Sequence, residues 1–148
     1  MTANERGEFV TTVPEKTTQT YSDPAIRSVL IVDDNVAIAG ALAKILGAAK
    51  FATHVYFRGS DALACVQNTA FDGAVIDIHL PDINGLVLSK KLRELWGPAK
   101  PIIVLSGDNS MEVINSLPHV GATHFFSKPV SANRLLEHLR KEMGLGKA

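Results

Sequence analysis

Residues 28–34 read Ser28-Val29-Leu30-Ile31-Val32-Asp33-Asp34, and this stretch decides the fold class. The run that ends at Val32 is apolar and rich in β-branched side chains, without the alternation expected of a strand that has one face in water. Such a run is typical of a strand that is buried on both faces. It therefore predicts a sheet covered by helices on both sides, with an acidic pair at the carboxyl end of this strand.

Similar apolar runs recur along the chain and alternate with helical patterns. We expect strands at residues 28–32, 53–56, 74–77, 102–106 and 124–127. We expect helices at residues 36–49, 60–68, around 88–95, 111–117 and 131–143. Ile38, Leu42 and Ile45 are predicted to face inward from the first of these helices, and Leu88, Leu92 and Leu95 from the third. Five strand-then-helix units in succession predict an α/β fold with a doubly wound, parallel five-stranded sheet.

The length of 148 residues fits one domain. Residues 1–27 are rich in Thr, Glu, Lys and Pro without apolar periodicity, so we expect a flexible N-terminal tail there; a short helix or a partner-docking segment is the alternative. The folded domain is expected at 28–143 and a C-terminal tail at 144–148.

Composition excludes some functions. Fifteen basic residues balance fifteen acidic ones, so net charge offers no case for binding nucleic acid or anionic lipid. Cys65 is the only cysteine, which rules out an internal disulfide and favours a reducing compartment. The sequence shows neither a signal peptide nor an apolar run of the ~20 residues that a membrane span needs. We expect a soluble, cytoplasmic protein.

Polar residues stand at the carboxyl ends of the predicted strands, where ligands bind in open α/β sheets. They are Asp33, Asp34, Asp77, Ser106 and Lys128. Taken separately, each has an ordinary explanation, such as a helix cap for the acidic pair or a surface position for the lysine. Those explanations do not predict that all five gather at one edge of the sheet.

This set of side chains suits phosphoryl transfer. Carboxylates that lie close together repel one another unless a cation is present, and oxygen ligands without His or Cys favour Mg²⁺, with Mn²⁺ as a substitute. A lysine and a serine hydroxyl can hold phosphoryl oxygens, and a carboxylate can accept the group as an acyl phosphate.

Four segments resemble the receiver domains of bacterial two-component response regulators. They are Ile31-Val32-Asp33-Asp34-Asn35, Val75-Ile76-Asp77-Ile78-His79-Leu80-Pro81-Asp82-Ile83-Asn84-Gly85, Val104-Leu105-Ser106-Gly107 and Phe125-Phe126-Ser127-Lys128-Pro129. The resemblance covers about residues 28–143 and implies a flavodoxin-like strand order of 2-1-3-4-5.

The resemblance also implies a role for each matching residue. Asp77 would be the phosphoacceptor, supplied by a histidine kinase or a histidine phosphotransfer protein. Mg²⁺ would be held by Asp33, Asp34, Asp77 and the backbone carbonyl of His79. Ser106 and Lys128 would contact the phosphoryl group, Phe125 would be the switch aromatic at a position where many receivers have tyrosine, and the Lys128-Pro129 bond would be cis. In this family the positions of His79 and Asp108 influence the lifetime of the phosphoryl group.

The sequence favours a stand-alone receiver that acts through a downstream protein target, without a DNA-binding domain or a membrane anchor. Its chemistry would be self-phosphorylation and autodephosphorylation rather than enzymatic turnover. Two alternatives stay open: a phosphatase of the haloacid-dehalogenase type, whose Asp-x-Asp pattern Asp33-Asp34-Asn35 does not match, and a receiver-like module that takes up no phosphate. The sequence leaves open whether phosphorylation causes homodimerisation.

Overall fold

One β-sheet runs through the computed structural model, which describes residues 2–3, 9–11, 26–107 and 111–145. Its strands are β1 (Thr2–Ala3), β2 (Phe9–Thr11), β3 (Ser28–Val32), β4 (Ala52–Tyr56), β5 (Gly73–Asp77), β6 (Ile102–Ser106) and β7 (His124–Ser127). The helices are α1 (Val36–Ala48), α2 (Gly59–Val66), α3 (Gly85–Trp96), α4 (Met111–Ser116) and α5 (Ala132–Glu142), with a 3₁₀ turn, η1 (Leu117–Val120), after α4.

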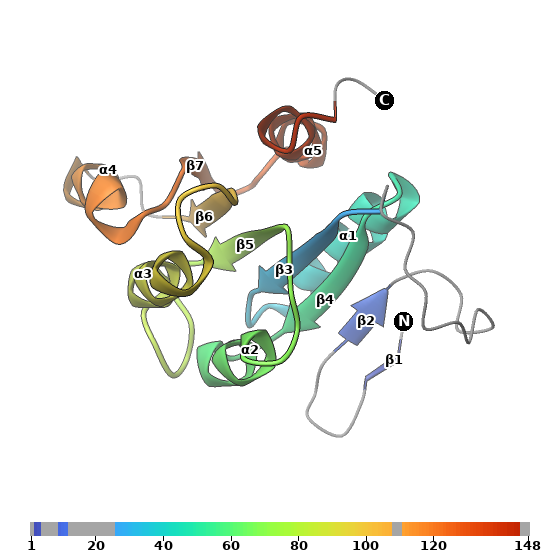
Figure 1. The fold of residues 1–148 in the computed structure, drawn as a ribbon, viewed down its shortest axis with the longest axis horizontal. Coiled ribbons are helices and arrows are strands. Elements are labelled where there is room, and N and C mark those ends of the chain that lie inside the picture. The colour runs from blue at the N-terminus through green and yellow to red at the C-terminus, as the bar shows by residue number, and fades with distance from the viewer. Residues whose placement is uncertain (1, 4–8, 12–25, 108–110, 146–148) are drawn as a thin grey trace.

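Five of the strands are parallel and lie in the order β4-β3-β5-β6-β7. Numbered along the folded domain, this is the order 2-1-3-4-5, which confirms the predicted fold class. Helices connect these strands and lie on the two faces of the sheet (Figure 1). All five parallel strands therefore present their carboxyl ends at the same edge.

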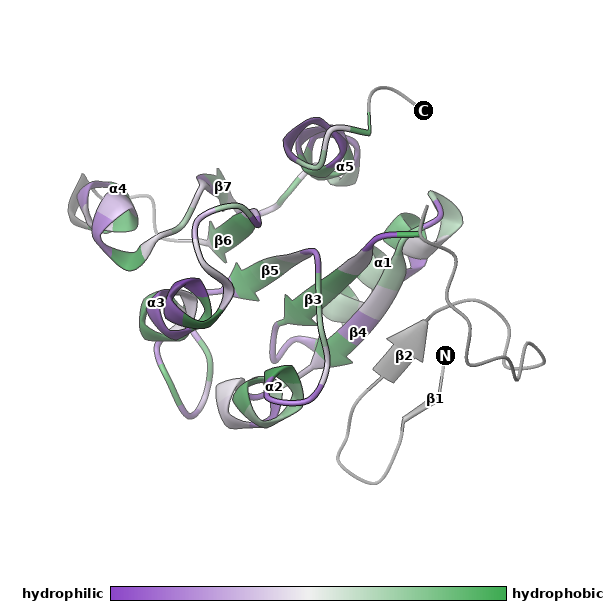
Figure 2. Ribbon diagram, in the orientation of Figure 1, coloured by the Kyte–Doolittle hydropathy of each residue, from purple (hydrophilic) through white to green (hydrophobic). Residues whose placement is uncertain are grey.

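The sheet separates two apolar cores. On one face, Val29 and Ile31 of β3 pack with the buried sides of α1 and α5. On the other face, Leu30 and Val32 pack with α2 and α3. The central strands are hydrophobic along their length, as Figure 2 shows. Burial on both faces explains why the run from Val29 to Val32 lacks an alternating pattern.

Short polar residues fix the starts of three helices. Asn35 accepts a hydrogen bond from Ile38 N at α1, Asn84 from Leu86 N at α3, and Ser131 from Arg134 N at α5. These side chains satisfy N–H groups that have no partner within their helix. Helix α2 differs, because Arg58 at its N-cap makes no such bond.

The N-terminal range, where a flexible tail is predicted, contributes two short strands to the sheet. Strand β2 pairs antiparallel with the outer edge of β4, and β1 pairs with β2, so the full order of strands is β1-β2-β4-β3-β5-β6-β7. For the rest of the range up to residue 25, which lies outside the described residues, the flexible tail stays a prediction. An uncovered β4 edge would present unpaired N–H and C=O groups, which β2 pairs instead. In the predicted C-terminal tail, Leu145 packs against the core that α1 and α5 share.

Two predictions about helix faces are wrong. Ile45 is 38% exposed and Leu95 is 52% exposed. In α1 the buried residues are Ala39, Leu42, Ala43 and Leu46.

Among the helices of the described ranges, none combines the length and the hydropathy that a bilayer crossing requires.

Candidate functional site

The structure brings the predicted site residues together at the carboxyl edge of the sheet. Asp33 follows β3, Asp77 is the last residue of β5 and Ser106 is the last residue of β6. Lys128 follows β7, whose Ser127 pairs with Ser106 in the sheet. Four neighbouring strands thus supply the site, although the residues are far apart in the chain.

Lys128 links two of the carboxylates. Its Nζ atom lies 3.2 Å from Asp33 Oδ2 and 3.3 Å from Asp77 Oδ2. Its backbone N–H donates to the carbonyl of Ser106 over 2.9 Å, which fixes the start of the lysine side chain beside β6. The Lys128–Pro129 peptide bond is cis, as the resemblance implied. The lysine thus holds its charge between the ends of β3 and β5.

The second oxygen of each carboxylate is held by backbone. Asp33 Oδ1 accepts the N–H of Asn35 over 2.9 Å, and Asp77 Oδ1 accepts the N–H of His79 over 3.3 Å. Asp33 is 1% exposed and Asp77 4% exposed. Both side chains are therefore fixed in orientation and nearly withdrawn from water.

Burial and mutual repulsion act on the charges of this cluster. Burial raises the pKa of Asp33, the N–H of Asn35 opposes that change, and the nearby charge of Asp77 raises the pKa further. For Lys128, burial acts to lower the pKa, but the attraction of Asp33 and Asp77 outweighs it and raises the pKa. The ammonium ion is thus retained where the carboxylates meet.

The residues present fit a divalent cation. Asp33, Asp34 and Asp77 offer oxygen atoms that all lie within 4.8 Å of one another, and Asp34 is exposed to solvent. Three carboxylates and one ammonium give a local charge of −2 when all are ionised. Oxygen ligands with an open, solvent-facing side are the set that Mg²⁺ prefers, because it keeps part of its water shell.

The loop after β5 packs tightly against the acceptor strand. Gly85 N donates to the carbonyl of Ile78 over 2.7 Å. A Cβ atom at Gly85 would overlap the carbonyl oxygen of Asp77, and it would lie 2.7 Å from Ile78 Cα. Glycine is therefore required at this position for the chain to turn back along the end of β5.

The same loop carries His79 and Asp82. Together with Asp34 they line a depression of about 400 Å³ that the whole of residues 78–84 borders. Asp82 accepts hydrogen bonds from the N–H groups of Gly59 and Ser60 at the start of α2. Sequence reasoning missed this role of Asp82, because its partners lie more than twenty positions away and the local pattern carries no sign of them.

The remaining predicted residues lie around the cluster. Ser106 is fully buried. Phe125, in β7, is partly buried and pairs with Val104 of β6. His79 has an exposed side chain. Asp108, expected to influence the phosphoryl lifetime, lies outside the described residues.

Comparison with known proteins places the chain in a family. The model of the response regulator receiver domain matches residues 29–140. The chain belongs to this family. Its acid cluster and lysine are the residues to which the receiver resemblance assigned the phosphoacceptor site: Asp33, Asp34, Asp77 and Lys128.

Individual relatives agree with that assignment. Over 113 residues the chain is 38% identical to the photosynthetic apparatus regulatory protein RegA of Rhodobacter capsulatus, covering 76% of this chain and 61% of RegA. It is 30% identical to the regulatory protein VanR of Enterococcus faecium, covering 78% of this chain and 49% of VanR. The crystal structure of a CheY-like receiver domain protein from Methanospirillum hungatei superposes with a TM-score of 0.77 at 30% identity, covering 81% of this chain and 95% of that one. The chain thus spans less than two thirds of these two curated relatives.

Proposed function

We propose that Asp77 accepts a phosphoryl group from the phosphohistidine of a histidine kinase or a histidine phosphotransfer protein. A carboxylate oxygen of Asp77 attacks phosphorus, a P–O bond forms and the P–N bond of the donor breaks. The imidazole nitrogen leaves with the bonding electron pair and takes up a proton. The contact of Asp77 with Lys128 over 3.3 Å, inside the buried acid cluster, is the observation that supports this role.

The chain's own residues divide the work of this transfer. Asp77 is held by His79 N and by Lys128, so the attacking carboxylate needs little reorganisation. Lys128 stabilises negative charge that spreads over the phosphoryl oxygens, and the hydroxyl of Ser106 donates to one of them.

The carboxylates of Asp33, Asp34 and Asp77, with the backbone carbonyl of His79, would hold Mg²⁺, and Mn²⁺ would substitute. When bound, the metal ion neutralises charge on the carboxylates and on the phosphoryl group. Asp33 also contacts Lys128. The metal ion and the ammonium of Lys128 would therefore lie beside the same carboxylate oxygens.

Phosphorylation would act as a switch rather than as one step of enzymatic turnover. An acyl phosphate at Asp77 draws the Ser106 hydroxyl toward it, and Phe125 turns into the space that is released. Both residues lie at the β6–β7 pair. The change would therefore reach α4 and α5, the helices before and after β7 in the chain, and alter the surface that a downstream protein target recognises. Because the proposed phosphohistidine donor would be charged from ATP, the proposal includes a cytoplasmic location.

The test is intact-protein mass spectrometry after incubation with Mg²⁺ and acetyl phosphate, from which acetate leaves as the P–O bond to Asp77 forms. We expect a mass increase of one phosphoryl group, and no increase when EDTA is present during the incubation. A histidine kinase that recognises this protein should give the same product faster than acetyl phosphate does. If neither donor modifies the protein, the proposal is contradicted. Rapid turnover of unrelated phosphoesters would favour a phosphatase.

A further inference from the structure

Helix α2 takes its N-terminal cap from a distant loop. Arg58, at its N-cap, makes no side-chain hydrogen bond to the helix. Instead, Gly59 N donates to Asp82 Oδ1 over 2.9 Å and Ser60 N donates to Asp82 Oδ2 over 2.8 Å. The first N–H groups of a helix have no partner within it, and a carboxylate there also meets the positive end of the helix dipole. Asp82 therefore ties the loop after β5 to α2.

This contact requires a glycine on the α2 side. A Cβ atom at Gly59 would overlap the side chain of Ile83 and would lie 3.6 Å from Asp82 Oδ1. A larger residue at position 59 would force the Ile83 side chain, which fills this space, to shift. The contact thus depends on the carboxylate of Asp82 in the loop and on the absence of a side chain at Gly59 in α2.

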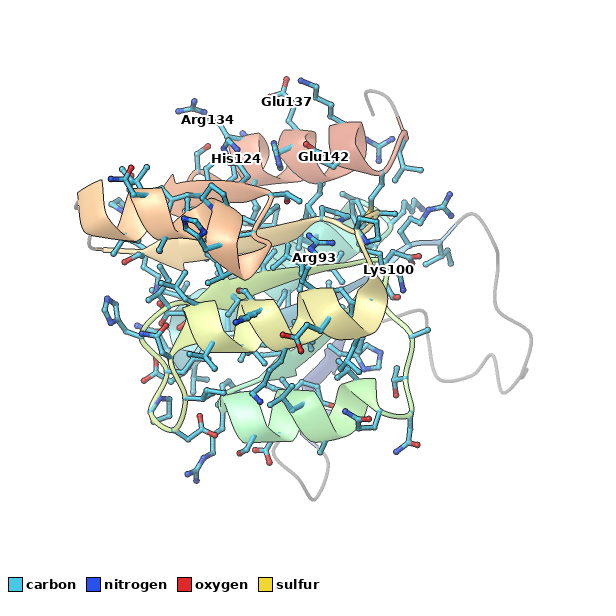
Figure 3. The ribbon with its side chains drawn as sticks, turned by 60° about the vertical axis from the view of Figure 1, so that its left-hand side comes forward. Arg93, Lys100, His124, Arg134, Glu137 and Glu142 are labelled. Atoms are coloured by element: carbon cyan, nitrogen blue, oxygen red, sulfur yellow. The ribbon has the colours of Figure 1, made fainter. Side chains whose placement is uncertain are left out.

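The other end of the loop is fixed independently. Gly85 packs on the backbone of Asp77 and Ile78, and Asn84 caps α3 by accepting Leu86 N over 2.7 Å. His79 precedes both anchors in the chain; it forms a bridge with Asn84, and its N–H donates to Asp77 Oδ1. Because α2 and α3 pack side by side (Figure 3), the loop is attached to two neighbouring helices.

We propose that Asp82 is a positioning residue for the metal site: by capping α2 it holds residues 78–84 so that the backbone of His79 faces the acid cluster. Asp82 is not a member of that cluster, so it acts through the loop and not as a ligand. A site gains affinity when its backbone ligands are already ordered before binding. This inference rests on the proposed function, because it assumes that Mg²⁺ binds beside Asp77.

The experiment is isothermal titration calorimetry of the full chain with Mg²⁺ alone, paired with urea unfolding of each variant. Asp82→Ala removes both acceptors from Gly59 N and Ser60 N. We expect its Kd for Mg²⁺ to rise about tenfold, the lower end of what loss of an outer supporting group causes. Asp82→Asn keeps one acceptor oxygen and should give an intermediate Kd. Gly59→Ala displaces the loop by a different route and should raise the Kd as well.

The matched control is Asp61→Ala. Asp61 lies in the first turn of the same helix, so this change weakens α2 without releasing the loop. Its Kd for Mg²⁺ should stay at the wild-type value even if its stability falls.

If Asp82→Ala lowers stability but binds Mg²⁺ like the wild type, Asp82 is only a helix cap and the inference is overturned. If that variant does not fold, the Kd of Asp82→Asn decides in the same way. A wild-type chain that binds no Mg²⁺ overturns the proposed function together with this inference. Wild-type binding with unchanged variants overturns this inference alone.

Discussion

The Nζ atom of Lys128 lies 3.3 Å from Oδ2 of Asp77, so the residue after the last strand reaches back to the end of β5, the middle one of the five parallel strands. Asp33 shares the same ammonium at 3.2 Å. The contact neutralises part of the charge of the two buried carboxylates and marks where a third anionic group would be stabilised.

Replacing Lys128 with Met should slow phosphorylation by acetyl phosphate about a hundredfold, the typical effect of removing one pre-organised partner of transition-state charge. The rate is measured from intact masses over time at saturating Mg²⁺. Lys44→Met, on the exposed side of α1, is the control and should react like the wild type. A Lys128→Met rate close to wild type would show that the ammonium does not act on the phosphoryl group.

Ser106→Ala should slow the same reaction about tenfold or more, because a hydrogen bond to a charged group contributes about 1.5–3 kcal/mol. Ser106→Thr keeps the hydroxyl and should retain most of the rate. The two variants are compared at equal folded fraction, checked by circular dichroism, since Ser106 is fully buried. Equal rates for Ala and Thr would rule out a role for the hydroxyl.

Gly85→Ala should destabilise the fold by about 1–3 kcal/mol, as overpacking typically does, because its Cβ meets the backbone of Asp77 and Ile78, which cannot move aside. Gly47→Ala, in α1 with nothing within 4 Å of the new Cβ, should instead stabilise by about 0.5–1 kcal/mol. Urea unfolding measures both changes. A Gly85→Ala variant as stable as the wild type would contradict the close packing of the loop on β5.

The surroundings of His138 in α5 predict that the fold loses stability at acid pH. Its ring stacks on His124 of β7 at 4.2 Å between centroids, and its Nε2 lies 3.6 Å from Glu142 Oε1. Burial, aided by the neighbouring His124, lowers the pKa of His138 below its ordinary value of 6.5. Figure 3 shows His124 and Glu142 together on this side of the molecule.

The sign follows from the proton balance. Between the ordinary pKa and the lowered one, the unfolded chain binds more protons than the folded chain, so the free energy of unfolding falls as the pH drops below 6.5. His138→Phe should make this fall smaller, as measured by urea unfolding at about pH 7.5 and about pH 5.5, on either side of the usual histidine pKa. An unchanged difference between the two pH values would show that His138 does not contribute.

The parallel sheet could be predicted from the sequence because its strands, buried on both faces, are unbroken apolar runs such as Val29 to Val32. Asp33, Asp77 and Lys128 could be predicted as neighbours because parallel strands end at one edge. The helix faces were harder. Ile45 and Leu46 are adjacent apolar residues of α1, and only packing against the sheet decides that Leu46 is the buried one.

Two other features depend on contacts that no local pattern records. Strand β2 forms because the edge of β4 is available to pair with it, while its own residues lie in a Thr-rich segment that resembles a tail. Asp82 reads as an ordinary loop acid until the fold brings Gly59 and Ser60 to it.

The most direct test of a phosphoacceptor at Asp77 is to map the modified residue. The protein is phosphorylated with acetyl phosphate and Mg²⁺, reduced with borohydride, which converts an acyl phosphate of aspartate to homoserine, and digested for peptide mass spectrometry. We predict homoserine at position 77 and nowhere else, and none in Asp77→Asn. Homoserine at another aspartate of the wild-type chain, or none in protein that carries the added phosphoryl mass, would contradict the assignment.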